Sequence, residues 1–294
     1  MLIDIHVHTC RPRRFTFMPW CEFPSPAQLL SLMDAARIDK AVLLSVISPE
    51  WGFPIVTPEE VMDICSERPD RFIPFANVDP RMLRNCARGD LRPVLRRFKE
   101  VGFKGIGEYM PTLPFDDPAN VAVFRQVEEV DLPLTFHIAP VASGVYGCYD
   151  ELGLPRLENV LKLCPKLNLL GHSPAFWAEI SSDVTDSSRQ GYPTGKVTPG
   201  RVVDLLRAYP NLYGDLSAGS GYNAISRDPD FACGFLEEFQ DRLLFGTDVT
   251  HAAQDLPIVP FFRELREKRL ISPEALDKIS WRNANSILDL HLTP

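Results

Sequence analysis

Eight short apolar segments recur along the chain, and each is followed by a stretch in which apolar residues have helical spacing. Most are continuous runs rather than alternations, which is typical of strands covered on both faces in a parallel sheet. Eight strand–helix alternations predict an α/β fold, a parallel (β/α)8 TIM barrel ringed by helices. The segments lie at 2–8, 40–46, 72–79, 103–109, 132–139, 167–173, 212–218 and 243–249.

Capping residues predict where several helices begin. Ser25 and Thr57 each precede a proline, so each is expected to be an N-cap with proline at the first helical position. A doubly wound open sheet would favour a glycine-rich phosphate turn after the first strand, and the sequence there is His-Val-His-Thr-Cys instead. Helices are expected at 26–38, 58–68, 90–101, 117–130, 157–163, 200–208, 230–239, 256–268 and 272–290.

The length suits one barrel. The 294 residues supply about 37 residues for each of eight strand–helix units, so residues 1–294 are predicted to form a single domain. The formal net charge is −8, with no basic character over the whole chain. Nucleic acid and anionic membrane surfaces are therefore not expected as partners, and a small molecule is the expected substrate.

Targeting signals and cysteine patterns suggest a cytoplasmic location. No window of 18 apolar residues is present, and the N-terminus MLIDIHVH lacks the basic and apolar regions of a secretory signal. Seven widely spaced cysteines without a CxxC pair are expected to be unpaired thiols in a reducing compartment.

Two histidines of the first strand are the first candidates for a metal site. His6 and His8 are separated by one residue, so an extended strand places both side chains on the same face. We expect them, with Asp4, to point into the barrel while Ile3, Ile5 and Val7 face the helices. Two imidazoles on one face suit two ligands of a divalent cation, and the alternative is a hydrogen-bonded pair of core histidines.

Three further candidates end other strands of the expected barrel. His137 lies on the fifth strand, His172 ends the sixth and Asp248 ends the eighth, which neighbours the first when a barrel closes. Each alone could be a core histidine or a helix cap. Together with His6 and His8 they form a set rich in imidazole and carboxylate, which suits zinc or another first-row divalent metal.

These residues, in their order and spacing, resemble the amidohydrolase superfamily. IDIHVH, His137, the GHS containing His172 and the FGTD ending in Asp248 are similar to its amidohydrolase-related branch, which includes decarboxylases, lactone hydrolases and hydratases. The resemblance covers essentially the whole chain. It implies a barrel with a divalent metal, commonly Zn²⁺ and sometimes Mn²⁺, held by His6, His8, His137 and Asp248. His172 would be a further ligand or polarise the substrate oxygen, and a homodimer is consistent with the family.

The fourth strand leaves the number of metal ions open. It reads Phe-Lys-Gly-Ile-Gly-Glu-Tyr, in which Lys104 and Glu108 share a face. Glu108 is nearer the carboxyl end, so it is the better candidate ligand, and Lys104 should lie too deep. GIGE also resembles the metal-dependent deoxyribonuclease branch, where such a glutamate is a ligand. Glu108 could instead contact ligands or substrate, so one ion or two remain alternatives.

The leading functional interpretation is a metal-dependent hydrolase of a small, carboxylate-bearing molecule, acting on an amide, lactone or ester. Metal-activated water would attack, Asp248 would act as general base and His172 would stabilise charge on the attacked oxygen. The alternative is a non-oxidative decarboxylase or hydratase that uses the same site. A deoxyribonuclease is disfavoured by the −8 charge, and a non-catalytic barrel would be expected to lack ligands.

Two loops are candidates for substrate recognition. Arg11, Arg13 and Arg14 follow the first strand, and could either anchor a substrate carboxylate or form a solvated basic loop. The loop 173–199 is long enough to be a lid or binding loop, and carries Trp177, Arg189 and Tyr192.

Overall fold

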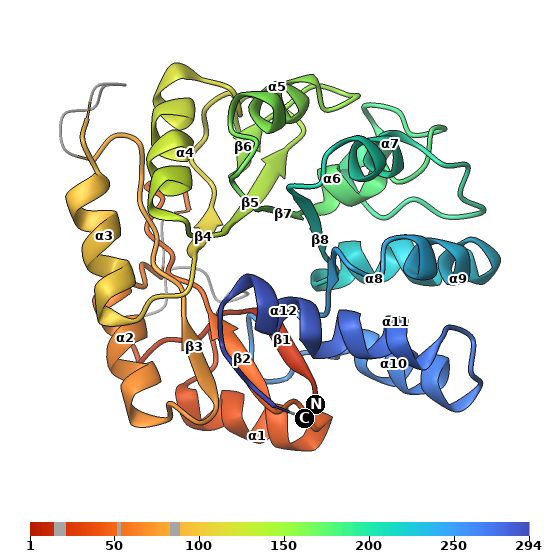
Figure 1. Ribbon diagram of the computed structural model, residues 1–294, viewed down its shortest axis with the longest axis horizontal. Coiled ribbons are helices and arrows are strands. Elements are labelled where there is room, and N and C mark those ends of the chain that lie inside the picture. Colours follow the sequence, from red (N-terminus) through yellow and green to blue (C-terminus); the bar gives the residue numbers. More distant parts are fainter. Residues whose placement is uncertain (15–21, 52–53, 83–88, 294) are drawn as a thin grey trace.

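The computed structural model describes residues 1–14, 22–51, 54–82 and 89–293, and it contains the expected barrel strands (Figure 1). All paired strands run parallel in two sheets, ordered β1-β2-β3 and β4-β5-β7-β8-β9. The isolated parallel bridges Ala76↔Ile106 and Val7↔Val249 join these sheets at both edges. The prediction of a (β/α)8 TIM barrel is confirmed. The strands are β1 (Ile3–Val7), β2 (Lys40–Leu43), β3 (Phe72–Pro74), β4 (Ile106–Tyr109), β5 (Leu134–Ala139), β7 (Leu169–His172), β8 (Leu212–Asp215) and β9 (Leu243–Leu244).

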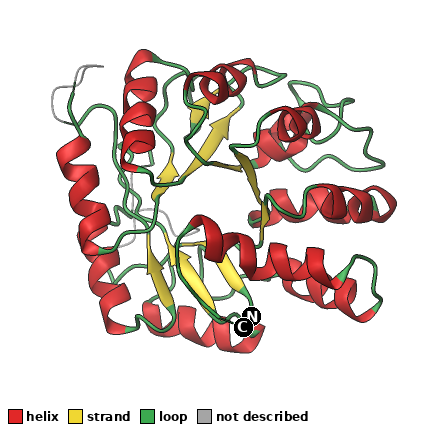
Figure 2. Cartoon of the chain, in the orientation of Figure 1, coloured by secondary structure: helices red, strands yellow, loops and turns green. Residues whose placement is uncertain are grey.

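The helices surround the strands (Figure 2), and several begin where their capping residues predict. Ser25 accepts from the backbone N–H of Gln28, and Thr57 from that of Glu60. The helices are α1 (Pro26–Ala36), α2 (Pro58–Glu67), α3 (Arg92–Val101), α4 (Pro118–Val130), α5 (Pro155–Leu163), α6 (Pro174–Ala178), α7 (Arg201–Ala208), α8 (Ala218–Ser226), α9 (Pro229–Glu238), α10 (Ile258–Glu267), α11 (Pro273–Asp277) and α12 (Asn283–Ile287).

The structure adds short elements that the periodicity did not predict. Strand β6 (Cys148–Tyr149) pairs with β5, and α6 and α8 follow β7 and β8 directly. The expected helix at 272–290 is instead α11, one π-helical turn and α12, ending at Ile287. Strand β6 and helix α6, of two and five residues, are too short for apolar spacing to reveal them. Helix α8 has nine residues and begins at the last residue of the segment expected to be a strand.

The expected orientation of β1 is wrong for Ile3 and Ile5. A bulge interrupts the pairing of β1 with β2 between Asp4 and Val7, which breaks the alternation of side chains. Val7 packs in the core cluster that contains the helix residues. Ile3 and Ile5 instead belong to a cluster drawn from β1, β2, β3, β7 and β9. Because β1 and β7 are not neighbours in the barrel, this second cluster fills the barrel interior.

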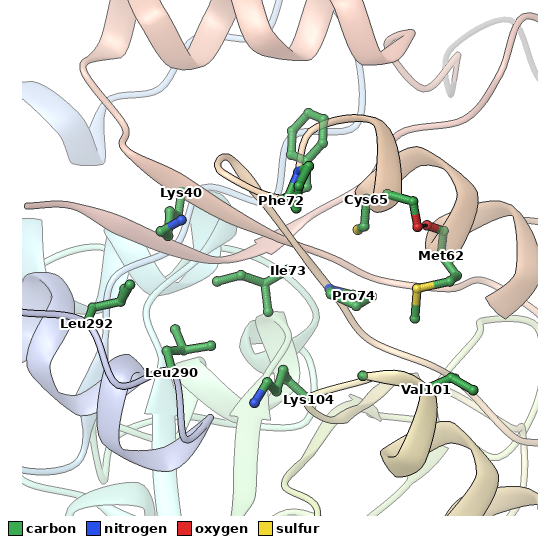
Figure 3. Close-up of a pocket in the computed structure, with 13 residues that line it drawn as sticks. Lys40, Met62, Cys65, Phe72, Ile73, Pro74, Val101, Lys104, Leu290 and Leu292 are labelled. Carbon is green, nitrogen blue, oxygen red and sulfur yellow. Dashed lines mark hydrogen bonds between the residues drawn. The ribbon is translucent and has the colours of Figure 1, made fainter.

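The end of the chain closes the barrel at the amino ends of its strands. Trp281, Ala284 and Leu288 belong to the interior cluster, and Leu290 and Leu292 pack against it. Figure 3 shows the latter two beside a pocket that also includes Lys40 and Lys104 at the amino ends of two strands. This end of the barrel lies opposite the candidate ligands at the carboxyl ends.

Replacement of Leu288 with alanine is expected to destabilise the fold strongly. The side chain is 1% exposed, and removing it leaves a cavity that typically lowers the free energy of unfolding by about 2–5 kcal/mol. Urea titration would measure the change, with the half-exposed Leu290 replaced by alanine as a comparison. An effect of L288A no larger than that of L290A would contradict the assigned packing.

Two further findings concern the described residues. None of the helices in the described part of the chain has the length and hydrophobicity to cross a membrane. Cys10, Cys65, Cys148, Cys164 and Cys233 are all unpaired, as predicted. The remaining two, Cys21 and Cys86, lie outside the described residues.

Candidate metal centre

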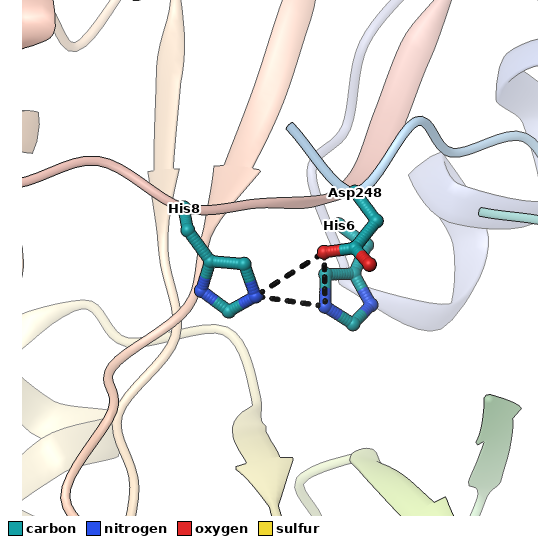
Figure 4. Close-up of side chains that lie close together, drawn as sticks. All are labelled: His6, His8 and Asp248. Carbon is teal, nitrogen blue, oxygen red and sulfur yellow. Dashed lines mark hydrogen bonds and ion pairs between the residues drawn. The ribbon is translucent and has the colours of Figure 1, made fainter. Parts of the chain in front are cut away.

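The carboxyl ends of the barrel strands bring all six candidate ligands into one cluster. Their positions follow from the fold: His6 is on β1 and His8 directly follows it, β4, β5 and β7 carry one each, and Asp248 lies on the segment after β9. All are nearly inaccessible to solvent except Asp248, whose side chain is 20% exposed. Figure 4 shows three of them converging. The cluster contains His6, His8, Glu108, His137, His172 and Asp248.

Three donor atoms of the cluster, from His6, His8 and Asp248, have the spacing of ligands to one metal ion, and Glu108 lies beside two of them. His6 Nε2 and His8 Nε2 are 3.1 Å apart, and Asp248 Oδ1 lies 3.6 and 3.4 Å from them. Glu108 Oε2 is 3.7 Å from His6 Nε2 and 3.6 Å from His8 Nε2. Ligands about 2.0–2.2 Å from a tetrahedral Zn²⁺ are about 3.3–3.6 Å from one another. These donors therefore fit a first-row divalent cation.

Glu108 lies between two groups of imidazoles. While its Oε2 faces β1, its Oε1 is 2.6 Å from His137 Nδ1 and 3.8 Å from His172 Nε2. The carboxylate could thus serve one ion or lie between two. Lys104, the other candidate on this strand, donates from Nζ to the Asp289 carbonyl at the opposite end of the barrel, so it is too deep, as expected.

Asp215 is a member of the site that the sequence interpretation missed. It ends β8, and its Oδ2 is 2.7 Å from His6 Nδ1. Because Nδ1 donates to this carboxylate, His6 Nε2 can present its lone pair to a cation. Ser217 Oγ, 3.0 Å from His172 Nδ1, occupies the equivalent position for that ring. The signal in the sequence was an aspartate in the middle of the predicted strand 212–218, and the observed strand ends at that residue.

Packing holds Asp215 and Asp248 in place. Trp177, expected on a loop, is instead buried in α6, and its indole N–H donates to the Asp215 carbonyl at 2.8 Å. Asp4 accepts from the backbone N–H and the hydroxyl of Thr247, at 2.9 and 2.5 Å. The next residue, Asp248, has a φ of 53°, a left-handed conformation that non-glycine residues adopt rarely.

The cluster changes the pKa values of its own members. Burial opposes ionisation of His6 and His8, but nearby carboxylates outweigh it and raise both pKa values. Burial likewise opposes ionisation of Glu108 and Asp248, yet the surrounding imidazoles lower both of their pKa values. Burial, reinforced by His6, lowers the pKa of His172 to about 4. Without a cation, protonated imidazoles of His6 and His8 would therefore offset the negative charges of Glu108 and Asp248.

Aromatic side chains wall the small pocket beside the cluster. The pocket measures about 30 Å³ and is lined by ligands together with Val46, Met110 and three aromatic residues. Phe23 stacks on His8 with ring centroids 5.0 Å apart, and Trp51 meets Tyr146 edge to face at 4.7 Å. Tyr146 also lies 4.6 Å from the His137 ring.

The basic loop after β1 pairs with helix α2. Arg11 Nη2 is 2.5 Å from Glu67, and Arg13 Nη2 is 2.6 Å from Glu60. Arg14 is exposed. None of the three is among the described residues that line the pocket, so the structure favours the reading as a surface loop.

The loop 173–199 has more structure than its sequence suggested. It begins with α6, and Arg189 is fully buried with its Nη2 2.8 Å from Glu179. Tyr192 is 57% exposed. His251 and His291 are both exposed and contribute nothing to the cluster.

We expect Gly147→Ala to displace His137. A Cβ at Gly147 would lie 2.7 Å from His137 Cδ2 and 3.0 Å from its carbonyl oxygen. Gly144→Ala is a matched control, because Gly144 also has a positive φ but no atom within 4 Å of the added carbon. G147A should weaken metal binding by about tenfold or more, as measured by competition with a chelator, whereas G144A should not. Equal affinities would contradict a role for His137.

Comparisons with known proteins identify the family. A family model described as Amidohydrolase matches residues 3–290, so the chain belongs to the amidohydrolase family. The resemblance inferred from the motifs is confirmed. Among curated proteins, none matches the sequence.

Solved structures with this fold include both lyases and hydrolases. An uncharacterised TIM-barrel protein from Bordetella bronchiseptica is 17% identical with a TM-score of 0.65, covering 98% of both chains. A dihydroxybenzoic acid decarboxylase from Polaromonas with bound manganese is 17% identical (TM-score 0.60, 99% and 98% covered). A probable 2-pyrone-4,6-dicarboxylic acid hydrolase from Acinetobacter baumannii is 15% identical (TM-score 0.60, 98% and 99% covered). At these identities the likeness concerns the fold.

Proposed function

We propose that this protein is a divalent-metal-dependent enzyme that decarboxylates a small planar carboxylic acid. The observation that carries the proposal is a cluster of imidazole and carboxylate donors that opens onto a pocket with aromatic walls. Phe23, Trp51 and Tyr146 offer ring faces and edges to a flat conjugated molecule. A manganese-bound decarboxylase among the solved structures of this fold supports the choice.

His6, His8, Glu108 and Asp248 would hold the cation, with His137 and His172 completing the centre or holding a second ion. A cation there would act as a Lewis acid that binds and polarises substrate oxygens. Zn²⁺ and Mn²⁺ both suit this mixed donor set.

Residues of this chain would supply the proton that the ring carbon takes up after CO₂ is lost. Loss of CO₂ breaks the bond between the carboxylate and the ring, and the electron pair left on the ring carbon must take up a proton. Asp248 and His172, whose Oδ2 and Nε2 atoms are 3.8 Å apart, are the groups that would deliver this proton. Ser217 and Asp215 fix the far side of the His172 ring.

Hydrolysis by the same site is the second candidate. It is favoured by the position of Asp248, whose Oδ1 lies within 3.6 Å of two candidate ligand nitrogens. There Asp248 would take a proton from an attacking water, and His172 would stabilise the charge that grows on a lactone or ester oxygen.

Product analysis distinguishes these reactions. The protein, loaded with Mn²⁺ or Zn²⁺, would be incubated with 2,6-dihydroxybenzoate and related hydroxybenzoates, and separately with aryl lactones and esters. Metal-dependent release of CO₂ that is lost in Asp248→Asn supports the proposal. Hydrolysis of lactones or esters without CO₂ release would replace it with the second candidate. A metal-loaded protein inactive toward both panels would contradict both.

Metal binding is expected to strengthen as the pH rises from 6 to 8. The cation needs deprotonated imidazoles, and the raised pKa values of His6 and His8 let protons compete at pH values above 6.5. The same protons stabilise the metal-free fold at low pH, and this contribution is lost as the pH rises through those pKa values. The difference in Tm between loaded and metal-free protein should therefore widen with pH. A difference independent of pH would contradict this assignment.

A further inference from the structure

The pocket beside the candidate metal centre is too small to enclose a benzoate-sized molecule. As the described residues form it, its volume is about 30 Å³, which is space for only a few water molecules. A substrate whose oxygens bind beside His172 and Asp248 therefore leaves the rest of its atoms outside the pocket. Those atoms have to lie against the segments that follow the barrel strands.

One of these segments, the loop 182–198 after α6, is held in place at its neck and by a buried side chain. At the neck, the N–H of Ser182 donates to the Thr198 carbonyl at 2.8 Å. Within the loop, Arg189 is fully buried and its Nη2 is 2.8 Å from Glu179. Breaking a buried ion pair is strongly destabilising, so the loop is fixed against the barrel.

Tyr192 lies three residues after Arg189, on the outer part of this loop, and is 57% exposed. Its hydroxyl end nevertheless packs on the barrel: a Cβ added at Gly219, in the first turn of α8, would be 3.0 Å from Tyr192 Oη and 3.1 Å from its Cζ. Partial burial raises the pKa of this phenol, and the charge of Asp248 contributes to the same shift. The phenol is therefore close to the candidate ligands and still accessible from solution.

The two residues before this glycine connect its position to the metal centre. Ser217 Oγ is 3.0 Å from His172 Nδ1. The N–H of Ala218 donates at 3.3 Å to the carbonyl of Thr247, which directly precedes Asp248. The hydroxyl end of the phenol thus lies at the rim of the centre, between the segments that follow β8 and β9.

We propose that Tyr192 is a substrate-binding residue, which contacts the part of the substrate that projects from the small pocket. A phenol suits this position, because its ring packs on a conjugated molecule and its hydroxyl can donate to or accept from an oxygen substituent. The inference rests on the proposed function and deepens it by assigning a substrate contact outside the metal centre.

Two carboxylates of different size test the contact in Mn²⁺-loaded protein. Acetate can bind through its carboxylate without reaching Tyr192, whereas 2,6-dihydroxybenzoate has to project from the pocket. The proton relaxation of water bound to Mn²⁺ would report the binding of each. Tyr192→Ala should weaken binding of 2,6-dihydroxybenzoate by about tenfold and leave that of acetate unchanged. Thr194→Ala, at another exposed position on the same loop, is the control and should change neither.

The outcomes separate this inference from the proposed function. Metal content and Tm would show that each variant is loaded and folded. If Y192A binds 2,6-dihydroxybenzoate as tightly as the native protein, or loses acetate to the same degree, the inference is overturned, while CO₂ release by the native protein still supports the proposed function. If Y192A loses only 2,6-dihydroxybenzoate and the native protein releases no CO₂, the contact stands and the decarboxylase proposal fails. If native protein shown to contain metal does not bind 2,6-dihydroxybenzoate, both fail.

Gly219→Ala provides an independent test, because it displaces the phenol without removing it. It should weaken binding of 2,6-dihydroxybenzoate by about threefold when Tyr192 is present and have no effect in Y192A. Gly234→Ala on α9 is the control, since a Cβ there would have no atom within 4 Å. Equal affinities of G219A and G234A, or an equal loss from G219A with and without Tyr192, would contradict the inference.

Discussion

Replacing His6 with alanine is expected to weaken binding of a divalent metal by at least about a hundredfold and to abolish metal-dependent turnover. His6 Nε2 lies 3.1–3.7 Å from donor atoms of His8, Asp248 and Glu108, so it is central to the cluster. The loss of metal affinity should be larger for H6A, which removes a ligand, than for Asp215→Asn, which removes only the group that orients that ligand. Equilibrium dialysis with Zn²⁺ or Mn²⁺, followed by elemental analysis, would measure the change.

His251→Ala is the matched control for this variant. It removes an imidazole close in sequence to Asp248 but exposed and outside the cluster. We expect H251A to keep the metal affinity of the native protein. Equal metal binding by H6A and H251A would place the cation elsewhere, or show that there is none.

Asp215→Asn is expected to weaken metal binding by about 10- to 100-fold without unfolding the barrel. The amide keeps the shape of the carboxylate but no longer favours a His6 ring that donates from Nδ1. Loss of that preference leaves Nε2 protonated in a fraction of the molecules, where it cannot bind a cation. Because Asp215 is the main group that raises the pKa of His6, dialysis at several pH values should also show that proton competition with the metal moves to lower pH in D215N.

Asp230→Asn is a suitable control, since Asp230 is exposed on α9 and is not part of the cluster. A purely structural role for Asp215 would lower the Tm of D215N while leaving the metal affinity of the folded protein unchanged. That outcome would reject its assignment as a positioning residue.

The barrel and the main ligand set were predictable because both depend on short, strong patterns. Parallel strands are buried on both faces, so all eight appear as apolar runs, and their carboxyl ends meet at one end of the barrel. Any polar side chain at the carboxyl end of a predicted strand is therefore a candidate for the functional site. His6, His8, His137, His172 and Asp248 were identified in this way, and the structure brings them together.

The remaining features depend on contacts or local backbone geometry that a linear pattern does not contain. The bulge between Asp4 and Val7 breaks the alternation along β1, so Ile3 and Ile5 do not share a face with Val7. Asp215 was overlooked because its role is visible only through its distance to His6. The partners of Arg11 and Arg13 lie about 50 positions away in the chain, on α2, so pairing could not be inferred from the loop alone.

The metal content of the native protein tests the central claim most directly. Protein purified without chelators, then supplied with Zn²⁺ or Mn²⁺ and dialysed, would be analysed for bound metal beside the H6A variant. We expect one or two ions per native chain, which are lost on chelation and absent from H6A. Native protein that retains no metal, or H6A that retains as much, would contradict the assignment of this cluster as a metal centre.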